Sequence, residues 1–167
     1  ILLDGKEREL PIIESTIGVP SLDIRNLGKY NYFTYDPGFT STAACTSKIT
    51  YVDGNKGELL YRGYPIEQLA EKCDYLDVSY LLMHGELPDT AKKTNYLKSI
   101  SSHSLLHDQL NNIFGGFRRD AHPMAVMVGV VGSMSAFYFD NMDINDANHR
   151  QISAQRLIAK IPTIAAW

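Results

Sequence analysis

The chain has 167 residues, of which 44% are hydrophobic and 21% are charged, values that are ordinary for a globular protein. This length could bury one core, because domains commonly contain about 100–150 residues. The formal net charge of −3 gives no basic surface and argues against nucleic acid as a partner. Cys45 and Cys73 lack the spacing of a zinc site. We interpret them as buried or free thiols in a reducing compartment, with a disulfide as the alternative.

Strand and turn signals fill the first part of the chain. The segments KITYV and ELLYR flank DGNKG, whose Asp-Gly start and closing Gly57 predict a β-hairpin over residues 48–62. In FTYDPGF, Pro37 and Gly38 occupy the positions that a type II turn prefers. We therefore predict a small β-rich N-terminal region over residues 1–62.

From residue 63 to residue 167 the pattern becomes helical, so the predicted fold class is mainly α. Gly85 is a suitable end for one helix, Asp89 can cap the next, and Gly115 follows a third. The expected helices cover residues 65–72, 74–84, 89–102, 103–114, 122–139 and 146–167.

The uncharged run HPMAVMVGVVGSMSAFYF, residues 122–139, is close to the shortest length that can cross a bilayer. Its small and polar residues favour a buried helix instead, so we expect no membrane partner. Pro123 suits the first position of that helix. Gly129 and Gly132 lie about one turn apart, a spacing that would let another backbone approach closely.

The last helix contains Pro162, which is expected to kink it. The chain then stops in the apolar run RLIAKIPTIAAW without a glycine or a polar cap, and it starts at Ile1 as if within a strand. We therefore expect a piece of a larger protein, interrupted within its last helix.

Two groups of residues could hold a ligand at the start of a helix or along one. His103 and His107 have metal-ligand spacing on a helix, but they lack the Glu of H-E-x-x-H and a third ligand, so no metal is expected. Arg118 and Arg119 precede the helix that starts near Pro123, where an anion could bind. The favoured alternative is that the following aspartate, in FRRDAHP, pairs with one arginine and caps the helix.

Arg156 and Lys160 lie four residues apart, and like charges at that spacing repel unless an anion joins them. A solvated surface is the alternative. Tyr138 could belong to the core. No Ser/His/Asp arrangement, glycine-rich phosphate loop or pair of carboxylates stands out, so residue chemistry alone identifies no reaction.

Four stretches taken together resemble the citrate synthases of bacteria. They are FTYDPGFTSTAACTSKITYVDGNKGELLYRGYPIEQLAE, YLLMHGELP, FRRDAHPMAVM and RLIAKIPTIAA, and they occur in the order of that family. The β-rich beginning and FRRDAHPMAVM most resemble the hexameric, type II subgroup. Methylcitrate synthase is the nearest enzymatic alternative.

The resemblance implies the N-terminal portion of a citrate-synthase-like helical large domain, incomplete here and preceded by the β-rich region. The parent enzyme would be an acyltransferase of the bacterial cytoplasm. It would condense acetyl-CoA with oxaloacetate and water to citrate and CoA at the entry to the tricarboxylic acid cycle, without a cofactor. The catalytic motifs of the family lie later in the sequence. We therefore expect no catalytic residue here and an inactive fragment.

The resemblance also implies contacts with other molecules. Residues 122–139 and 146–167 match helices of a subunit interface, so the expected partner is a second copy, in a homodimer or a trimer of dimers. The subgroup has a regulatory NADH site, and the matching residues here are His103, Ser104, Tyr138, Arg156 and Lys160. Ser102 replaces an arginine of NADH-sensitive members, so weakened NADH binding is expected. A non-catalytic nucleotide-binding or assembly module, or a generic helical interaction domain, is the alternative.

Overall fold

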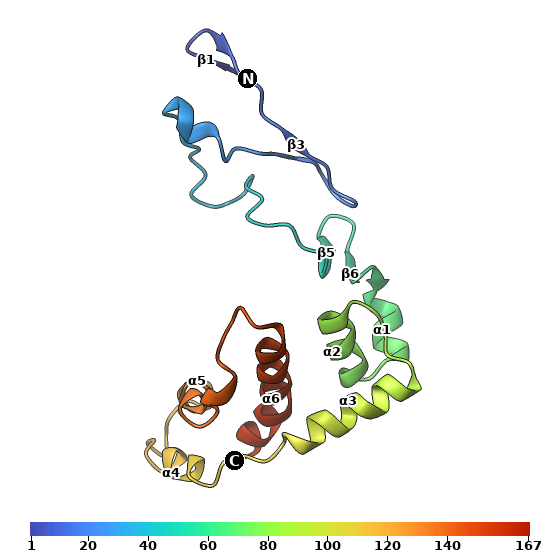
Figure 1. The fold of residues 1–167 in the computed structure, drawn as a ribbon, viewed down its shortest axis with the longest axis vertical. Helices are drawn as coiled ribbons and strands as arrows, with labels where there is room; N and C mark the ends of the chain where they lie inside the picture. Colours follow the sequence, from blue (N-terminus) through green and yellow to red (C-terminus); the bar gives the residue numbers. More distant parts are fainter. The chain divides into compact units, whose positions relative to one another are not determined.

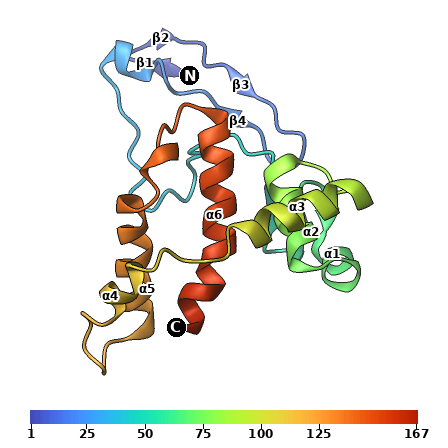
Figure 2. The same ribbon diagram turned by 60° about the horizontal axis from the view of Figure 1, so that its bottom comes forward.

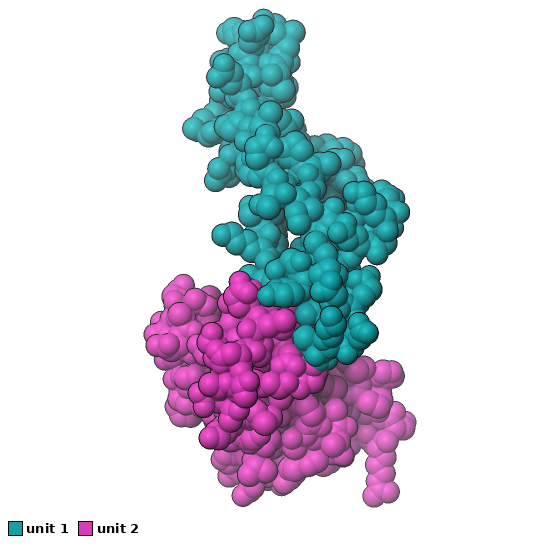
Figure 3. Space-filling model, turned by 90° about the vertical axis from the view of Figure 1, so that its right-hand side faces the viewer, with its two compact units in different colours: residues 1–73 teal, residues 74–167 magenta.

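The computed structural model describes all 167 residues, which form two compact units, Ile1–Cys73 and Asp74–Trp167 (Figure 3). The first unit contains every strand and one α-helix, and the second contains the other five α-helices. The expected mainly α fold with a β-rich beginning is therefore confirmed. The boundary predicted after residue 62 lies before the division between the two units, so the first α-helix is grouped with the strands.

The strands of the first unit pair in three small antiparallel sheets (Figure 1). The pairings are β1 (Leu2–Leu3) with β2 (Lys6–Glu7), β3 (Ile12–Ile13) with β4 (Ser21–Leu22), and β5 (Thr50–Asp53) with β6 (Glu58–Tyr61), which also pairs with β7 (Tyr64–Pro65). The 3-10 helix η1 (Leu27–Tyr30) and the helix α1 (Ile66–Lys72) complete the unit.

The predicted hairpin over residues 48–62 is confirmed. Asp53 pairs with Glu58 across it, and the Asp53 carboxylate accepts the backbone N–H of Asn55 at 3.0 Å. A tight turn then joins β6 to β7, with positive φ of 51° at Arg62 and 89° at Gly63. This combination is typical of the type I′ turn, whose twist matches that of antiparallel strands.

The type II turn predicted at Pro37 and Gly38 is wrong. The chain does turn, because the Phe39 N–H donates to the Asp36 carbonyl oxygen at 3.1 Å. However, the positive φ, 50°, belongs to Phe39 and not to Gly38. The Asp36 carboxylate explains the difference, since it draws the following residues around itself. It accepts hydrogen bonds from Thr40, Ser41 and Thr42.

The second unit is made of helices, and most of them begin and end where the capping residues predict. They are α2 (Tyr75–His84), α3 (Thr90–Ser102), α4 (Leu110–Phe114), α5 (Pro123–Ser133), η2 (Met134–Ala136), η3 (Phe139–Asn141) and α6 (Ala147–Ala166). Gly85 ends α2 with a φ of 92°, and the Asp89 carboxylate caps α3 by accepting the Lys92 N–H. Pro162 lies inside α6.

The helix predicted over residues 103–114 is wrong in its first half, because only Leu110–Phe114 is helical. Its backbone groups have other partners. The ammonium of Lys160 donates to the carbonyl oxygens of His103 and Leu105, and the His107 N–H donates to the Tyr138 hydroxyl oxygen. A helix would need those same groups for its own hydrogen bonds. Contacts with residues distant in the sequence therefore outweigh the local helix propensity of this segment.

The long helix α6 lies between α4–α5 on one side and α2–α3 on the other (Figure 2). It contributes to both hydrophobic clusters of the unit, through Ala159 to one and through Ile164 to the other. Ala159 packs with Tyr96 and Ile100 of α3. Ile164 packs with Leu110, Val130 and Met134. Because one helix joins the two clusters, α6 is the central element of the unit.

Helix α5 is shorter than the run over residues 122–139 and is only partly buried. Val130 is fully buried, whereas 58% of Met124 and 73% of Val128 are exposed. No helix of the structure combines the length and the apolar character needed to span a membrane.

The two glycines of α5 have different surroundings. A Cβ atom at Gly129 would lie 2.7 Å from Cζ of Phe117, so this glycine accommodates an aromatic ring. A Cβ at Gly132 would have no neighbour within 4 Å. Within this chain, therefore, the neighbour of Gly129 is the Phe117 side chain and not the backbone of another helix.

These surroundings give a matched pair of substitutions. Both Gly129→Ala and Gly132→Ala should gain helix propensity, but only Gly129→Ala inserts a methyl group against a packed ring. We expect Gly129→Ala to have the lower free energy of unfolding of the two by about 1–3 kcal/mol. Urea denaturation of both variants measures this difference, and equal stabilities would contradict the packing of Phe117 on Gly129.

Candidate functional site

The second unit brings together all five residues expected to form the regulatory site. His103 ends α3 and Ser104 follows it, while Tyr138 lies between η2 and η3. Arg156 and Lys160 project from successive turns of α6. Residues separated by more than fifty positions in the sequence therefore meet at one place.

Lys160 is the centre of this group and is only 4% exposed. Its Nζ donates to the carbonyl oxygen of His103 at 2.7 Å and to that of Leu105. The same atom lies 4.6 Å from the centroid of the Tyr138 ring. An ammonium group is costly to bury unless polar groups surround it, and two carbonyls and an aromatic face supply that environment. A solvated position for Lys160 is therefore excluded.

Arg156 also approaches Tyr138, with its guanidinium carbon 5.3 Å from the ring centroid. Its two terminal nitrogens donate to the two carboxylate oxygens of Asp140 at 2.7 and 2.9 Å. This bidentate pair holds the pKa of Asp140 below its ordinary value, and His149 adds a weaker electrostatic effect in the same direction. The anion next to the two basic residues of α6 is therefore Asp140 of the same chain.

Tyr138 connects the two cations to the rest of the unit. It is half-buried and packs against the cluster of Leu110 and Val130, which agrees with the core position suggested by the sequence. Its hydroxyl oxygen also accepts the backbone N–H of His107 at 3.2 Å. A core position and a place in the site are thus compatible.

Ser104 takes part mainly through its backbone. Its carbonyl oxygen accepts the Thr163 hydroxyl at 3.0 Å, and its own hydroxyl donates to the Ser101 carbonyl oxygen at 2.9 Å. Ser102, in the last turn of α3, is exposed and donates to the Ser99 carbonyl oxygen at 2.8 Å. The Ser99 hydroxyl in turn donates to Gln155 of α6 at 2.8 Å, which joins the two helices.

Asp140, His107 and Thr163 complete the site. The sequence did not indicate Asp140 or Thr163, and it suggested His107 only as a metal ligand. Asp140 has no periodic relation to Arg156 in the sequence, and the contacts of the other two depend on the tertiary fold. The available signal was weak: an aspartate just after Tyr138, in a segment that precedes a basic helix.

The other candidate groups do not form a site of this kind. His103 and His107 do not share a helix face, because the chain is not helical between them, and no cluster of three metal-ligating side chains occurs in the structure. Arg118 pairs with Asp120, as the favoured alternative predicts. Asp120 does not cap α5, however, because His122 Nδ1 accepts the Met124 N–H at 3.2 Å.

The site brings two cations to one aromatic ring. Asp140 and two backbone carbonyl oxygens of the same chain already accept the hydrogen bonds of these cations. An external anion would have to displace Asp140 from Arg156 or the backbone carbonyls from Lys160. Such an arrangement can bind and orient an anionic or aromatic ligand, but it presents no pair of groups for acid–base or nucleophilic chemistry.

The lowered pKa of Asp140 has a consequence for stability. A carboxyl group with a depressed pKa in the folded state stabilises the fold above its ordinary pKa of 3.8, and this contribution is lost as the pH falls through the folded pKa. We therefore expect Asp140→Asn to unfold at a lower temperature than the wild type near pH 6. The two melting temperatures should converge as the pH falls below 3.8. A constant difference across this range would contradict an ionised Arg156–Asp140 pair.

Comparison with known proteins identifies the fold. The sequence model of the family described as "Citrate synthase, C-terminal domain" matches residues 38–167. Among solved structures, the citrate synthase of Pyrobaculum aerophilum is similar with a TM-score of 0.68 and 27% identity, over 92% of this chain and 37% of that one. The citrate synthase of Thermotoga maritima is similar with a TM-score of 0.65 and 25% identity, over 80% of this chain and 34% of that one.

A third structure, the citrate synthase of the archaeon Thermoplasma acidophilum in a ternary complex, shares the fold with a TM-score of 0.68 at 22% identity. It is matched over 77% of this chain and 34% of its own length. The chain thus spans between 34% and 37% of the three structures. Since the family match covers far more than half of its residues, the chain belongs to the citrate synthase family.

Proposed function

We propose that this chain is the N-terminal part of a citrate synthase of the bacterial type II subgroup. The whole enzyme would transfer the acetyl group of acetyl-CoA to oxaloacetate and release citrate and CoA, a reaction of the tricarboxylic acid cycle. The family match over residues 38–167 and the TM-score of 0.68 to the Pyrobaculum aerophilum enzyme carry the citrate synthase part of this proposal. The subgroup rests on the resemblance of the β-rich beginning and of FRRDAHPMAVM.

The substrates are supported by the Thermoplasma acidophilum structure, which holds carboxymethyl coenzyme A and oxaloacetate. The reaction needs a base for the acetyl methyl proton and groups that stabilise the enolate as it forms. We place those groups outside residues 1–167, as the resemblance to the family implies. Acetyl-CoA serves as a substrate, and no further cofactor is required for this chemistry.

The proposal predicts a difference between this chain and the full-length enzyme. The 167-residue chain alone should release no CoA from acetyl-CoA and oxaloacetate, whereas the full-length enzyme should release it at a normal enzymatic rate. A thiol reagent that reports free CoA measures both. CoA release by the chain alone would contradict our placement of the catalytic groups.

The same assay separates the two enzymatic alternatives. Propionyl-CoA in place of acetyl-CoA is the substrate of 2-methylcitrate synthesis, and a higher kcat/KM with propionyl-CoA would favour that activity. Release of CoA from neither substrate by the full-length enzyme would favour a non-catalytic nucleotide-binding or assembly module.

We also propose that the group around Tyr138 is a regulatory NADH site with low affinity. The ring and the two cations suit a nucleotide, since phosphate groups accept charge-assisted hydrogen bonds from Arg and Lys. Asp140 competes for Arg156, and Ser102 offers no charge at the exposed end of α3. Both features oppose tight binding.

An added arginine should strengthen this site. We expect Ser102→Arg to tighten NADH binding to the full-length enzyme by about tenfold, because one charge-assisted hydrogen bond contributes about 1.5–3 kcal/mol. Ser101→Arg is the matched control, because it adds the same charge at the neighbouring exposed position. Isothermal titration calorimetry measures both affinities. An equal gain in the two variants would indicate a general charge effect and contradict the site. Low-micromolar affinity in the wild type would contradict the weakened binding.

For its assembly, we propose a homodimer or a trimer of dimers in the bacterial cytoplasm. The exposed apolar side chains of Met124 and Val128 on α5 support this proposal, because exposed apolar faces often mark contacts between proteins. A second copy that covers α5 would exclude water from them.

A further inference from the structure

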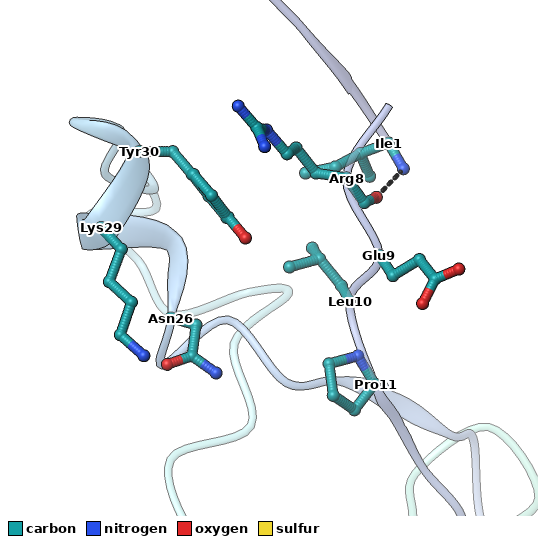
Figure 4. Close-up of a pocket in the computed structure, with 8 residues that line it drawn as sticks. All are labelled: Ile1, Arg8, Glu9, Leu10, Pro11, Asn26, Lys29 and Tyr30. Carbon is teal, nitrogen blue, oxygen red and sulfur yellow. Dashed lines mark hydrogen bonds between the residues drawn. The ribbon is translucent and has the colours of Figure 1, made fainter. Parts of the chain in front are cut away.

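The first unit contains a cavity of about 660 Å³ near its beginning, well apart in the sequence from the residues of the regulatory site (Figure 4). One wall is the chain that leaves β2, with Arg8, Leu10 and Pro11. The opposite wall is η1 and the residue before it, with Asn26, Lys29 and Tyr30. Sites for small molecules commonly have volumes of about 300–1,000 Å³, so this cavity has a suitable size.

Three contacts hold the walls in position. The Tyr32 hydroxyl donates to the Asp4 carboxylate at 2.6 Å and joins the segment after η1 to the β1–β2 hairpin. The Arg8 guanidinium lies 4.5 Å from the centroid of the Tyr30 ring. At the base, the Asp23 N–H donates to the Pro11 carbonyl oxygen at 2.8 Å, next to the pairing of β3 with β4. These three contacts join the elements that line the cavity.

The cations of this cavity have no anionic partner. Neither Arg8 nor Lys29 takes part in an ion pair, and Arg8 Nε is buried without a hydrogen-bond partner. Glu9 is the one carboxylate among the lining residues, and its side chain points away from Lys29 and Tyr30 (Figure 4). A ligand in the cavity cannot reach this occluded Nε, so what the cavity offers is the positive charge of Arg8 and Lys29, which no carboxylate neutralises.

A second cavity of about 210 Å³ adjoins the first and shares Arg8, Lys29 and Tyr30 with it. It adds a third cation, Lys6, which also has no ion pair. The carboxylate in this second cavity, Asp4, already accepts the Tyr32 hydroxyl. Positive charge therefore predominates along both cavities, although the whole chain carries a net charge of −3.

We propose that this pair of cavities binds a small, multiply charged anion that carries phosphate or carboxylate groups. The Arg8 guanidinium and the Lys29 ammonium would hold its oxygens, because charge-assisted hydrogen bonds are the strongest that such groups make. The Asn26 amide and the Tyr30 hydroxyl offer further donors, and Leu10 and Pro11 form an apolar wall. Lys6 would contact a second anionic group of the same molecule.

The test is isothermal titration calorimetry at physiological salt with two probes, inorganic pyrophosphate and citrate, each added to the protein alone. Lys29→Gln removes an exposed charge that lies on both cavities, so the fold should be preserved, as circular dichroism can verify. We expect this variant to weaken binding by about tenfold or more. Arg25→Gln is the control, since it removes a charge that pairs with Asp23 and does not line either cavity.

The probes separate the two sources of the ligand. Tighter binding of pyrophosphate would support a phosphate-bearing ligand, and tighter binding of citrate would support a carboxylate-bearing one. The proposal would be overturned if neither probe binds at millimolar concentration, or if Arg25→Gln weakens binding as much as Lys29→Gln does.

Discussion

The helical unit depends on the burial of one ammonium group. Lys160 is almost fully enclosed, and a buried charge persists only where polar groups replace its water. Two of those groups are carbonyl oxygens from residues 103 and 105, which a continuing helix would have used for its own hydrogen bonds. The chain therefore stops being helical after Ser102 and turns along α6. One side chain thus sets the end of α3, the course of the following segment and the contact of both with the central helix.

The same interaction explains why the candidate regulatory site has its particular character. Lys160 and Arg156 approach one aromatic ring, which places two positive charges beside the same side chain. Each charge is already engaged, by backbone carbonyls in one case and by Asp140 in the other. A ligand must therefore displace groups of the protein itself. Its affinity is then set by the difference between its own contacts with the two cations and the contacts that it replaces. The cavities of the first unit are different, because Arg8 and Lys29 have no carboxylate partner, although Arg8 lies over the Tyr30 ring.

Local sequence signals predicted the parts of the fold that depend on local chemistry. The hairpin around Gly57, the end of α2 at Gly85 and the cap of α3 at Asp89 need only neighbouring residues, and all three are present. The non-helical segment after His103 and the ring of Phe117 on Gly129 depend on residues far away in the sequence, and both differed from expectation. The five residues of the candidate regulatory site came from family resemblance, since no spacing rule relates α3 to α6. The pairing of Asp140 with Arg156 required the structure itself.

The most direct test of this account is amide hydrogen exchange at His107, in the wild type and in Lys160→Met. Its N–H donates to Tyr138 in the segment that Lys160 organises, so we predict measurable protection in the wild type. Removal of the ammonium should abolish that protection while the amides around Tyr96, in the middle of α3, remain protected. An unprotected His107 amide in the wild type, or protection that survives Lys160→Met, would contradict the central role of the buried lysine.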